Sequence, residues 1–586
     1  MTEPGNVPLH THDQDDRQLA PQYPLRGVRR FRIEGAGKEH MEVARNRTIV
    51  AVLLFVCCTF ALGIRLIDLG LVERVAETAS RGDRRGAVLA ARADIVDRNG
   101  VVLATNLTTA SLYADPKRVL DPEEAADRLL LALPSLNRAD LLNKLRADNR
   151  FVWIKRNLTP EEQYRVNSLG IPGLGFENED RRVYPHGRLA AHVLGFVDID
   201  GQGLAGIERF YNSRLANPGD VHEPLKLALD LRVQHVLHEE LSHAVETFSA
   251  IGGAGIVLDV NNGEVLGLVS LPDFDPNEPG SANTETLFNR VVQGVYELGS
   301  GMKVLTVAMA LDSGAATVTS SYDATQPLRV ARFTINDYHP EKRWLSLPEV
   351  FMVSSNIGTA RMAIDIGTET QRRYLADFGL LEKPRIELRE AASPLVPNPW
   401  REINTMTIGF GHGIAVTPLQ LVTSIAAVAN GGRLIPATLV KDDDAARIAA
   451  AKQVISPKTS DIMRKLLRIT VISGTGGKAD VPGYEVGGKT GSAEKASAGG
   501  YRRKALLSSF IAVFPSDAPR YAVFIIVDEP KGTRETYGFA TGGWTAAPTA
   551  GAVIRRIGPM LGVAPRPADE DQKARLRHAL LLPVSE

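Results

Sequence analysis

Apolar side chains recur at a helical spacing in one segment of the chain and form short continuous runs in others. From Asp230 onward, apolar residues stand three or four positions apart. Residues at this spacing share one face of a helix. The pattern therefore predicts a helix with one buried face, which opens a second domain at about residue 225. The apolar residues of this face are Val233, Val236, Leu237, Leu241, Ala244, Val245 and Phe248.

Two pairs of strand-like runs follow this helix. Residues 255–259 and 264–270 flank the turn sequence Asn261-Asn262-Gly263, which predicts an antiparallel hairpin. Residues 507–514 and 521–528 are separated by six residues, too few for the crossover helix that parallel pairing requires. We therefore expect both pairs to be antiparallel.

Helix-like apolar segments lie between the two pairs, at residues 304–311 and 419–429. A sheet assembled from strands that are distant in sequence, with helices between them, is typical of an α+β fold. We predict that this domain spans residues 225–563. Residues 564–586 return to charged, proline-containing sequence, and we expect a flexible C-terminal tail there.

The region before residue 225 has a mixed pattern. Strand-like segments at 111–114 and 151–155 alternate with short helices. Asp121-Pro122 and Thr159-Pro160 each place a capping side chain before a proline, and a carboxylate follows at the third helical position. We predict an elongated α+β pedestal over residues 71–224.

The stretch from Thr48 to Ile64 is uncharged and almost wholly apolar. Its 17 residues span roughly 25 Å as a helix, slightly less than a bilayer core of ~30 Å, and further apolar residues extend it. We predict a transmembrane anchor over residues 48–70. A cleaved signal peptide is the alternative, but 47 residues precede the run and no clear small-residue cleavage site follows it.

The charges around this run predict its orientation. Six Lys and Arg residues lie in 29–47, against four in 65–84, which favours a cytoplasmic N-terminus. Residues 1–47, rich in Pro, His, Asp and Gln, are expected to form a flexible cytoplasmic tail. The rest of the chain would then lie on the opposite side of the membrane.

The composition narrows the possible functions. Of 586 residues, 44% are hydrophobic and 23% are charged, values that exclude a mostly disordered chain and a polytopic membrane protein. The 68 basic and 68 acidic residues cancel, so no global field attracts nucleic acid, and none is expected as a partner. The two cysteines, Cys57 and Cys58, lie inside the apolar run, which excludes disulfide scaffolds and cysteine-ligated zinc. We expect no metal and no cofactor.

The sequence GYEVGGKT, from Gly483 to Thr490, matches the phosphate-binding loop of nucleotide hydrolases letter by letter. That loop requires a helix directly after its lysine, so that backbone N–H groups surround the phosphates. The segment that follows, GSAEKASAGG, is a poor helix former. The phosphate-binding loop also requires parallel strands, whereas the strands predicted here are antiparallel. An ATPase is therefore the weaker hypothesis.

A second interpretation uses the same lysine in a set of three short motifs, S-x-x-K, S-x-N and K-T-G. S-x-x-K occurs twice, S-x-N occurs three times and K-T-G occurs once. Serine acyltransferases with this set have the motifs in that order. Only one combination of these matches follows that order. It consists of Ser300 to Lys303, Ser354 to Asn356 and Lys489 to Gly491.

The spacing of the first motif suits a nucleophile and its base. Ser300 and Lys303 fall on one face of a helix, so the amine can take the serine proton if burial lowers its pKa. Residues 304–311 are apolar almost all round, which predicts a buried helix and a desolvated lysine. Ser354 is expected to relay the proton toward the leaving group, and Asn356 to hydrogen-bond a substrate amide.

The third motif suits substrate binding. We expect the glycine-rich segment ending in Lys489, Thr490 and Gly491 to form a strand at a sheet edge, where a substrate backbone can approach closely. Lys489 and Thr490 would bind a terminal carboxylate, and the backbone N–H groups of Ser300 and Ser492 would form an oxyanion hole. The alternative, in which Ser300 only caps a core helix and Lys489 is a surface charge, does not explain the order of the motifs.

These motifs resemble those of class B penicillin-binding proteins, and the resemblance extends from about residue 86 to 560. ARADIVDRNGVVLATN, RRVYPHGRLAAHVLGFV and GLAGIERFYN are similar to signatures of that class's pedestal. SLPDFDPN, VYELGSGMK, FMVSSNIG, GFGHGIAVTPLQL and GGWTAAP are similar to its transpeptidase domain. Leu298, where proline is usual, and Ser492, where threonine is commoner, depart from the pattern without removing a functional group.

The resemblance implies a penicillin-binding-protein transpeptidase fold, an antiparallel sheet with helices on both sides, preceded by the pedestal and one transmembrane helix. It implies a single-pass inner-membrane enzyme at the bacterial division septum that acylates Ser300 with peptidoglycan stem peptides and is trapped there by β-lactams. It also implies a lipid-linked-glycan polymerase and other division-complex membrane proteins as partners. The division-specific D,D-transpeptidases are most similar, and the elongation-specific relatives are the nearest alternative.

Two other classes share the motif order. A β-lactamase would need a base that activates water, and no residue of the sequence identifies one. A non-catalytic β-lactam sensor or scaffold would keep the fold without turnover. Most of the charged pedestal residues are expected to form an internal ion-pair network rather than a docking face for the polymerase. These residues are Arg92, Asp97, Arg98, Arg181, Arg182 and Glu208.

Overall fold

The computed structural model describes residues 53, 55–60, 62, 92–217, 223–330, 333–442, 444–497, 500–567, 569 and 571–582. The chain divides into two units, Met1–Leu89 and Ala90–Glu586. In the first unit, residues 55–60 are helical and exposed. Over the described residues, no helix has the length and apolar character needed to cross a membrane. The predicted tail 1–47 and most of the predicted anchor 48–70 lie outside the described residues.

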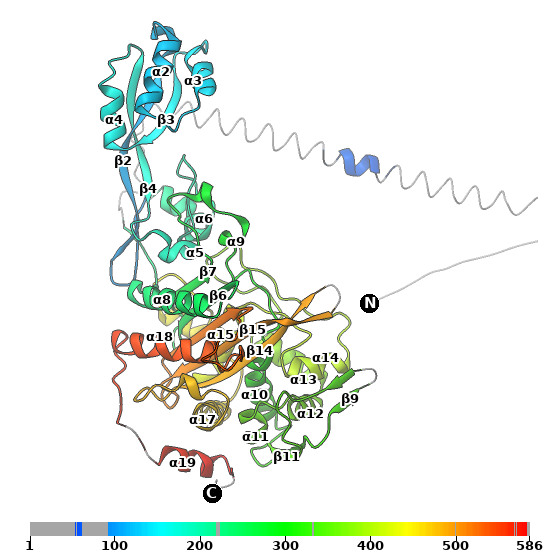
Figure 1. The fold of residues 1–586 in the computed structure, drawn as a ribbon. Helices are drawn as coiled ribbons and strands as arrows, with labels where there is room; N and C mark the ends of the chain where they lie inside the picture. The colour runs from blue at the N-terminus through cyan, green and yellow to red at the C-terminus, as the bar shows by residue number, and fades with distance from the viewer. Residues whose placement is uncertain are drawn as a thin grey trace, which may run out of the picture. The chain divides into compact units, whose positions relative to one another are not determined.

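The second unit begins with the pedestal sheet. Its long strand β2 (Val102–Ala114) pairs antiparallel with β4 (Leu174–Val183) and with β3 (Val152–Leu158). Helices α2 (Pro122–Ala132), α3 (Arg138–Leu145) and α4 (Pro160–Asn167) lie beside these strands (Figure 1). Asp121 caps α2, and Thr159 caps α4 through a capping box with Glu162, as the sequence predicts.

A buried cluster of charges holds the lower part of the pedestal together. Glu208 in α6 (Gly206–Phe210) is fully buried and accepts hydrogen bonds from Arg92 and Arg182, each over 2.7 Å. Tyr184 donates to the same carboxylate over 3.4 Å. The expected internal network is confirmed for these charges.

The pedestal is joined to the second domain through a short strand. β1 (Ile95–Val96) pairs antiparallel with β2 and parallel with β5 (Leu225–Lys226). Directly after β1, Asp97 accepts a hydrogen bond from the backbone N–H of Leu231 over 3.1 Å. Arg98 forms an ion pair with the buried Glu264 over 3.2 Å. These two charges therefore also act within the chain.

The second domain contains a five-stranded sheet in the order β14-β15-β16-β6-β7. The strands are β14 (Gly487–Ser497), β15 (Gly500–Phe514), β16 (Tyr521–Asp528), β6 (Gly252–Asp259) and β7 (Val265–Leu271). All four pairings are antiparallel, so both predicted hairpins are confirmed. β14 is an edge strand, as expected for the segment that carries K-T-G.

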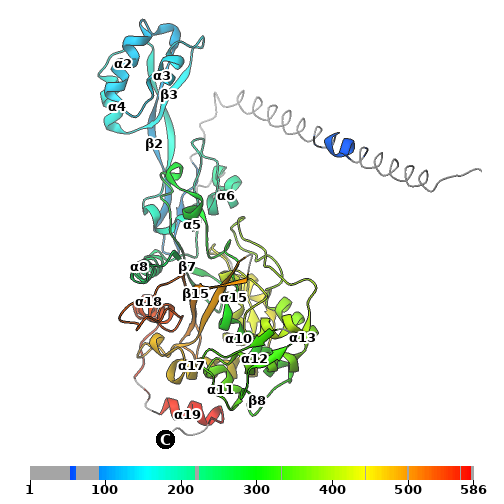
Figure 2. The same ribbon diagram turned by 45° about the vertical axis from the view of Figure 1, so that its right-hand side comes forward.

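Helices cover both faces of this sheet (Figure 2). α8 (Leu231–Thr247) and α18 (Ala546–Met560) pack on one face, and their buried apolar side chains form one core with alternate residues of the strands. α10 (Lys303–Ser313), α15 (Pro418–Ala429) and α17 (Pro457–Ser473) belong to a larger core on the other face. Asp230 caps α8, as the periodic pattern predicts.

Shorter elements complete the second unit. The helices are α5 (Ala191–Leu194), α7 (Asn212–Ala216), α9 (Thr284–Leu287), α11 (Leu347–Met352), α12 (Asn356–Ile366), α13 (Thr368–Asp377), α14 (Glu402–Gly409), α16 (Asp444–Ala449) and α19 (Gln572–Ala579). The strands are β8 (Ser321–Asp323), β9 (Leu328–Val330), β10 (Phe333–Ile335), β11 (Trp344–Ser346), β12 (Arg433–Leu434) and β13 (Lys452–Gln453). Single 3-10 turns lie at Pro116–Arg118, Gly187–Ala190, Pro279–Ser281, Gly299–Met302 and Gly477–Ala479.

The structure differs from the expectation of a flexible tail over residues 564–586. α19 forms near the end of the chain, and Leu580 and Leu582 after it are buried in the larger core. Gln572 also accepts a hydrogen bond from Arg468 of α17 over 2.9 Å. The prediction rested on the charged composition of the segment and did not take these two leucines into account. Their burial packs residues 571–582 against the larger core.

Candidate active site

Ser300 lies on a 3-10 turn, Gly299–Met302, that leads directly into α10. In a 3-10 turn, residues three positions apart stand above one another, which brings Ser300 over Lys303. Gly299 has φ +53°, and a Cβ atom there would lie 2.9 Å from the carbonyl oxygen of Ser492. Glycine therefore allows the turn to lie directly against β14, so that the first and third motifs meet.

Lys303 is fully buried at the start of α10. Its Nζ atom donates to the backbone oxygen of Ser354 and, over 3.1 Å, to the Oγ of Ser354. Ser354 Oγ donates in turn to Ser300 Oγ over 3.0 Å. The sequence predicts direct proton transfer from Ser300 to Lys303, whereas the structure links them through Ser354.

Lys489 is also fully buried, and its Nζ atom donates to Ser354 Oγ over 2.9 Å. It lies over the ring of Phe351, 5.9 Å from the centroid. Burial lowers the pKa of Lys489 to about 7. Burial, and then the nearby Lys489, hold the pKa of Lys303 well below its ordinary value, whereas Asp337 acts in the opposite direction. Burial therefore favours the neutral form of both amines.

Ser354 is held in an unusual backbone conformation, with φ +61°. Residues other than glycine rarely adopt this left-handed region of backbone conformation. The backbone strain, of about 1 kcal/mol or more, persists only where the surrounding structure enforces it. The next residue, Ser355, caps α12, and Asn356 Nδ2 donates to the backbone oxygen of Asn336 over 3.0 Å. The strained turn directs the Ser354 hydroxyl at Ser300 and both lysines.

The remaining K-T-G residues follow Lys489 along the sheet edge. The hydroxyls of Thr490 and Thr475 lie 2.7 Å apart. A Cβ atom on Gly491 would lie 3.0 Å from the backbone oxygen of Leu298, so glycine is needed where β14 meets the Ser300 turn. Ser492 Oγ accepts a hydrogen bond from Gly542 N over 3.0 Å. The structure thus brings together all three motifs and the two predicted oxyanion donors, Ser300 and Ser492.

The phosphate-loop hypothesis for Lys489 is wrong. β14 continues as a strand from Gly487 to Ser497, so no helix N-terminus follows the lysine. β14, β15 and β16 are antiparallel, whereas that loop requires parallel strands.

Sequence reasoning missed two residues that hold the site in place. Thr475 follows α17 and contacts Thr490. Asp337 lies after β10 in an irregular segment, and its carboxylate accepts three hydrogen bonds from residues 355–357. Neither residue belongs to a motif or to a periodic pattern, so the sequence carried no signal for them.

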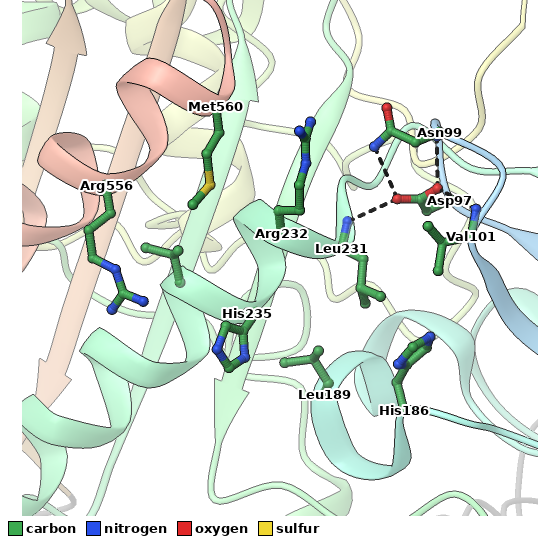
Figure 3. A pocket seen from close by; sticks show the side chains of 11 residues that line it. Asp97, Asn99, Val101, His186, Leu189, Leu231, Arg232, His235, Arg556 and Met560 are labelled. Atoms are coloured by element: carbon green, nitrogen blue, oxygen red, sulfur yellow. Dashed lines mark hydrogen bonds between the residues drawn. The ribbon is translucent and has the colours of Figure 1, made fainter.

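Two cavities differ in their relation to this site. One, of about 430 Å³, is lined by Glu297, three residues before Ser300, and by Glu494, two residues after Ser492. Another, of about 690 Å³, lies where the pedestal meets α8 and α18, and Figure 3 shows Asp97 hydrogen-bonded there to Asn99 and to the backbone of Leu231. The first cavity is therefore lined by chain neighbours of the Ser300 and Lys489 motifs, but by none of the motif residues themselves.

Two family models match the chain. Residues 253–554 match the penicillin-binding protein transpeptidase domain, and residues 87–218 match the penicillin-binding protein dimerisation domain. The chain is 41% identical over 547 residues to the "Probable peptidoglycan D,D-transpeptidase FtsI" of Caulobacter vibrioides, covering 91% of this chain and 92% of that protein. It is 28% identical to the "Peptidoglycan D,D-transpeptidase FtsI" of Escherichia coli K12, covering 84% and 87%.

Solved structures share the fold. The apo form of penicillin-binding protein 3 from Mycobacterium tuberculosis has a TM-score of 0.62 and 25% identity, over 82% of this chain and 98% of that chain. The aztreonam complex of the same protein has a TM-score of 0.63 and 24% identity, with coverage of 82% and 98%. The described architecture is therefore one that has been solved before with a β-lactam bound.

Proposed function

Because the chain belongs to the class B penicillin-binding proteins, we propose that it is a serine D,D-transpeptidase that cross-links peptidoglycan stem peptides during cell division. The observation that carries this proposal is the hydrogen-bonded network in which Ser354 Oγ joins Ser300 to both Lys303 and Lys489. The network offers a nucleophile, a buried amine base and a hydroxyl relay within one site.

The first half-reaction acylates Ser300. With the hydroxyls turned to donate in the order Ser300, Ser354, Lys303, the serine proton passes to the neutral amine as Oγ attacks the carbonyl carbon of the penultimate D-alanine. The C–N bond to the terminal D-alanine then breaks, and the leaving nitrogen takes a proton back from Lys303 through Ser354. The backbone N–H groups of Ser300 and Ser492 stabilise the oxyanion that forms in between.

The second half-reaction transfers the acyl group. An amine of a neighbouring stem peptide attacks the ester carbon and loses a proton to Lys303 through Ser354. The C–O bond breaks, and Ser300 Oγ regains its proton. Asn356 and the K-T-G edge hold the donor, with Lys489 and Thr490 directed to its terminal carboxylate and Gly491 giving the backbone close access.

A β-lactam enters the same first step. Ser300 opens the ring amide, but the leaving nitrogen stays tethered to the acyl group, so the acceptor amine is blocked. The matched family and the solved β-lactam complexes of structural neighbours support this reactivity.

Mass spectrometry after exposure to penicillin tests the catalytic assignment. A single penicilloyl adduct that maps to the Ser300 peptide and is absent from Ser300→Ala supports it. An adduct on another residue, or none on folded protein, contradicts it. Rapid hydrolysis of the adduct would indicate a β-lactamase, and a stable adduct without cross-linking of stem peptides would indicate a sensor or scaffold.

We also propose that the enzyme is a single-pass inner-membrane protein with a periplasmic catalytic part at the septum. The apolar run over 48–70 and the names of the similar proteins support this location. A lipid-linked-glycan polymerase and other division-complex membrane proteins are the expected partners. Depletion in the native bacterium should give filaments with continued side-wall growth, whereas rounded cells that still divide would indicate elongation instead.

A further inference from the structure

The carboxylate of Asp337 binds the turn that carries the second motif. Asp337 is 9% exposed and lies between β10 and β11. Its Oδ1 atom accepts hydrogen bonds from the backbone N–H groups of Asn356 and Ile357 over 2.5 and 3.0 Å. Its Oδ2 atom accepts one from Ser355 Oγ over 2.7 Å. One carboxylate therefore fixes three consecutive residues of the turn.

These contacts do more than cap a helix. α12 already has its own cap, because Ser355 Oγ accepts from Gly358 N over 3.0 Å. Asp337 adds a negative charge at the end of the helix where N–H groups are unpaired, and it holds the residues that directly follow the strained Ser354. Strained backbone persists only where the surrounding structure holds it in place. The contacts of Asp337 supply such a constraint for the backbone of Ser354.

The charge of Asp337 also acts on Lys303. The groups that influence the ionisation of Lys303 are Lys489 on β14, which disfavours its proton, and Asp337, which favours it. His412, after α14, is a further titratable neighbour of Lys303, and it also feels Glu297 and Glu494. Asp337 is thus the carboxylate that opposes the effects of burial and of Lys489 on the ionisation of Lys303.

We propose that Asp337 is a positioning residue of the acylation step, which holds the Ser354–Asn356 turn against the two lysines and supplies the counter-charge to Lys303. The inference rests on the proposed function, because it assumes that Ser300 is acylated. Asp337 does not touch the reacting atoms and acts through Ser354 and Lys303.

The test compares penicillin acylation rates across pH for the full-length protein and three variants. Asp337→Asn keeps an oxygen for the two backbone N–H groups but removes the charge, so acylation at the optimal pH should fall roughly tenfold. Losing the counter-charge lowers the pKa of Lys303, so the acidic limb of the profile should move to lower pH by about half a unit or more. Ser355→Ala removes the Oδ2 contact and the cap that Ser355 Oγ provides for α12, but it keeps the charge of Asp337, so it should slow acylation without moving that limb.

Asp230→Asn is the matched control, because Asp230 is a buried capping carboxylate at the start of α8 and has no contact with the site. It should change thermal stability while leaving the rate and the acidic limb as in the parent protein. The inference is overturned if Asp337→Asn leaves the acidic limb in place, or if Asp230→Asn slows acylation equally. If Asp337→Asn does not fold, an unchanged rate in Ser355→Ala overturns it. Absence of any adduct in the parent protein would instead contradict the proposed function.

Discussion

Lys489 donates a hydrogen bond to Ser354 over 2.9 Å, although the two residues are 135 positions apart in the chain. Lys303 donates to the same oxygen, and Ser354 donates its own proton to Ser300. A hydroxyl has one proton and two lone pairs, so this arrangement uses its full capacity. Two buried ammonium groups on one oxygen would repel each other, which favours at least one neutral amine.

Replacing Ser354 by alanine should slow penicillin acylation of Ser300 by roughly a hundredfold or more, because it removes the relay between the nucleophile and its base. The measurement is the second-order rate of adduct formation with a fluorescent penicillin. Ser313→Ala, at the exposed C-terminal end of the helix α10 that Lys303 begins, is the control and should react like the parent. A rate for Ser354→Ala within threefold of the parent would show that Lys303 takes the proton directly.

Lys489→Met should lower β-lactam acylation roughly ten- to a hundredfold, because a charge-assisted contact to a carboxylate contributes ~1.5 to 3 kcal/mol. The pKa of Lys489 is about 7, so the amine carries its charge below that pH and loses it above. The advantage of the parent protein should therefore shrink as pH rises from 6 to 8.5, about one to two units on either side of this value. A pH-independent ratio, or ATP binding that the variant loses, would contradict the assignment.

Glu208→Gln should lower the free energy of unfolding by about 3 kcal/mol, because it leaves Arg92 and Arg182 in a buried site without their carboxylate. Chemical denaturation followed by circular dichroism measures the change. The control is Glu161→Gln, which removes the carboxylate of an exposed pair with Arg165 and should cost less than about 1 kcal/mol. Equal effects of the two variants would argue against a structural role for the buried network.

His192 should make the fold less stable in acid. Its pKa is lowered from 6.5 to about 4, chiefly by burial, so the unfolded chain binds a proton in this range that the folded chain does not. Stability should therefore fall as pH drops from 6.5 to 4, by roughly 3 kcal/mol from this one group.

His192→Gln keeps a donor for the backbone oxygen of Thr286, which the imidazole binds over 2.8 Å, and cannot be protonated. Its unfolding free energy should depend less steeply on pH in this window than that of the parent. The exposed His235 offers a control, and His235→Gln should keep the parent's slope. Identical slopes in all three proteins would exclude His192 as the source.

The sequence predicted those features whose cause is local. Asp121, Thr159 and Asp230 cap helices where the cap and the following residues predict them. The short connections fix the hairpins as antiparallel, because a crossover helix does not fit. The motif order also identified Ser300, Ser354 and Lys489 as a group, and the fold brings them together.

Features that depend on distant partners escaped prediction. Asp337 stands in a segment without periodicity, and its partners begin 18 positions away. Ser354 has a left-handed backbone next to the residues that Asp337 binds. A glycine would have indicated this conformation in the sequence, but the residue is a serine. The sequence also did not show that Ser354 is the direct neighbour of the Ser300 hydroxyl, because helical spacing places Lys303 nearby but does not show which side chain lies between them.

The packed end of the chain determines where an expressed fragment can stop. Arg468, on the helix beside β14, binds Gln572 and also donates to the backbone oxygen of Val486 over 2.9 Å, directly before the strand that carries K-T-G. A fragment that ends at residue 563, the boundary suggested by composition, would lack Gln572, Leu580 and Leu582. Fragments expressed for crystallisation or inhibitor screening should therefore extend to at least residue 582, and C-terminal fusions need a linker beyond it.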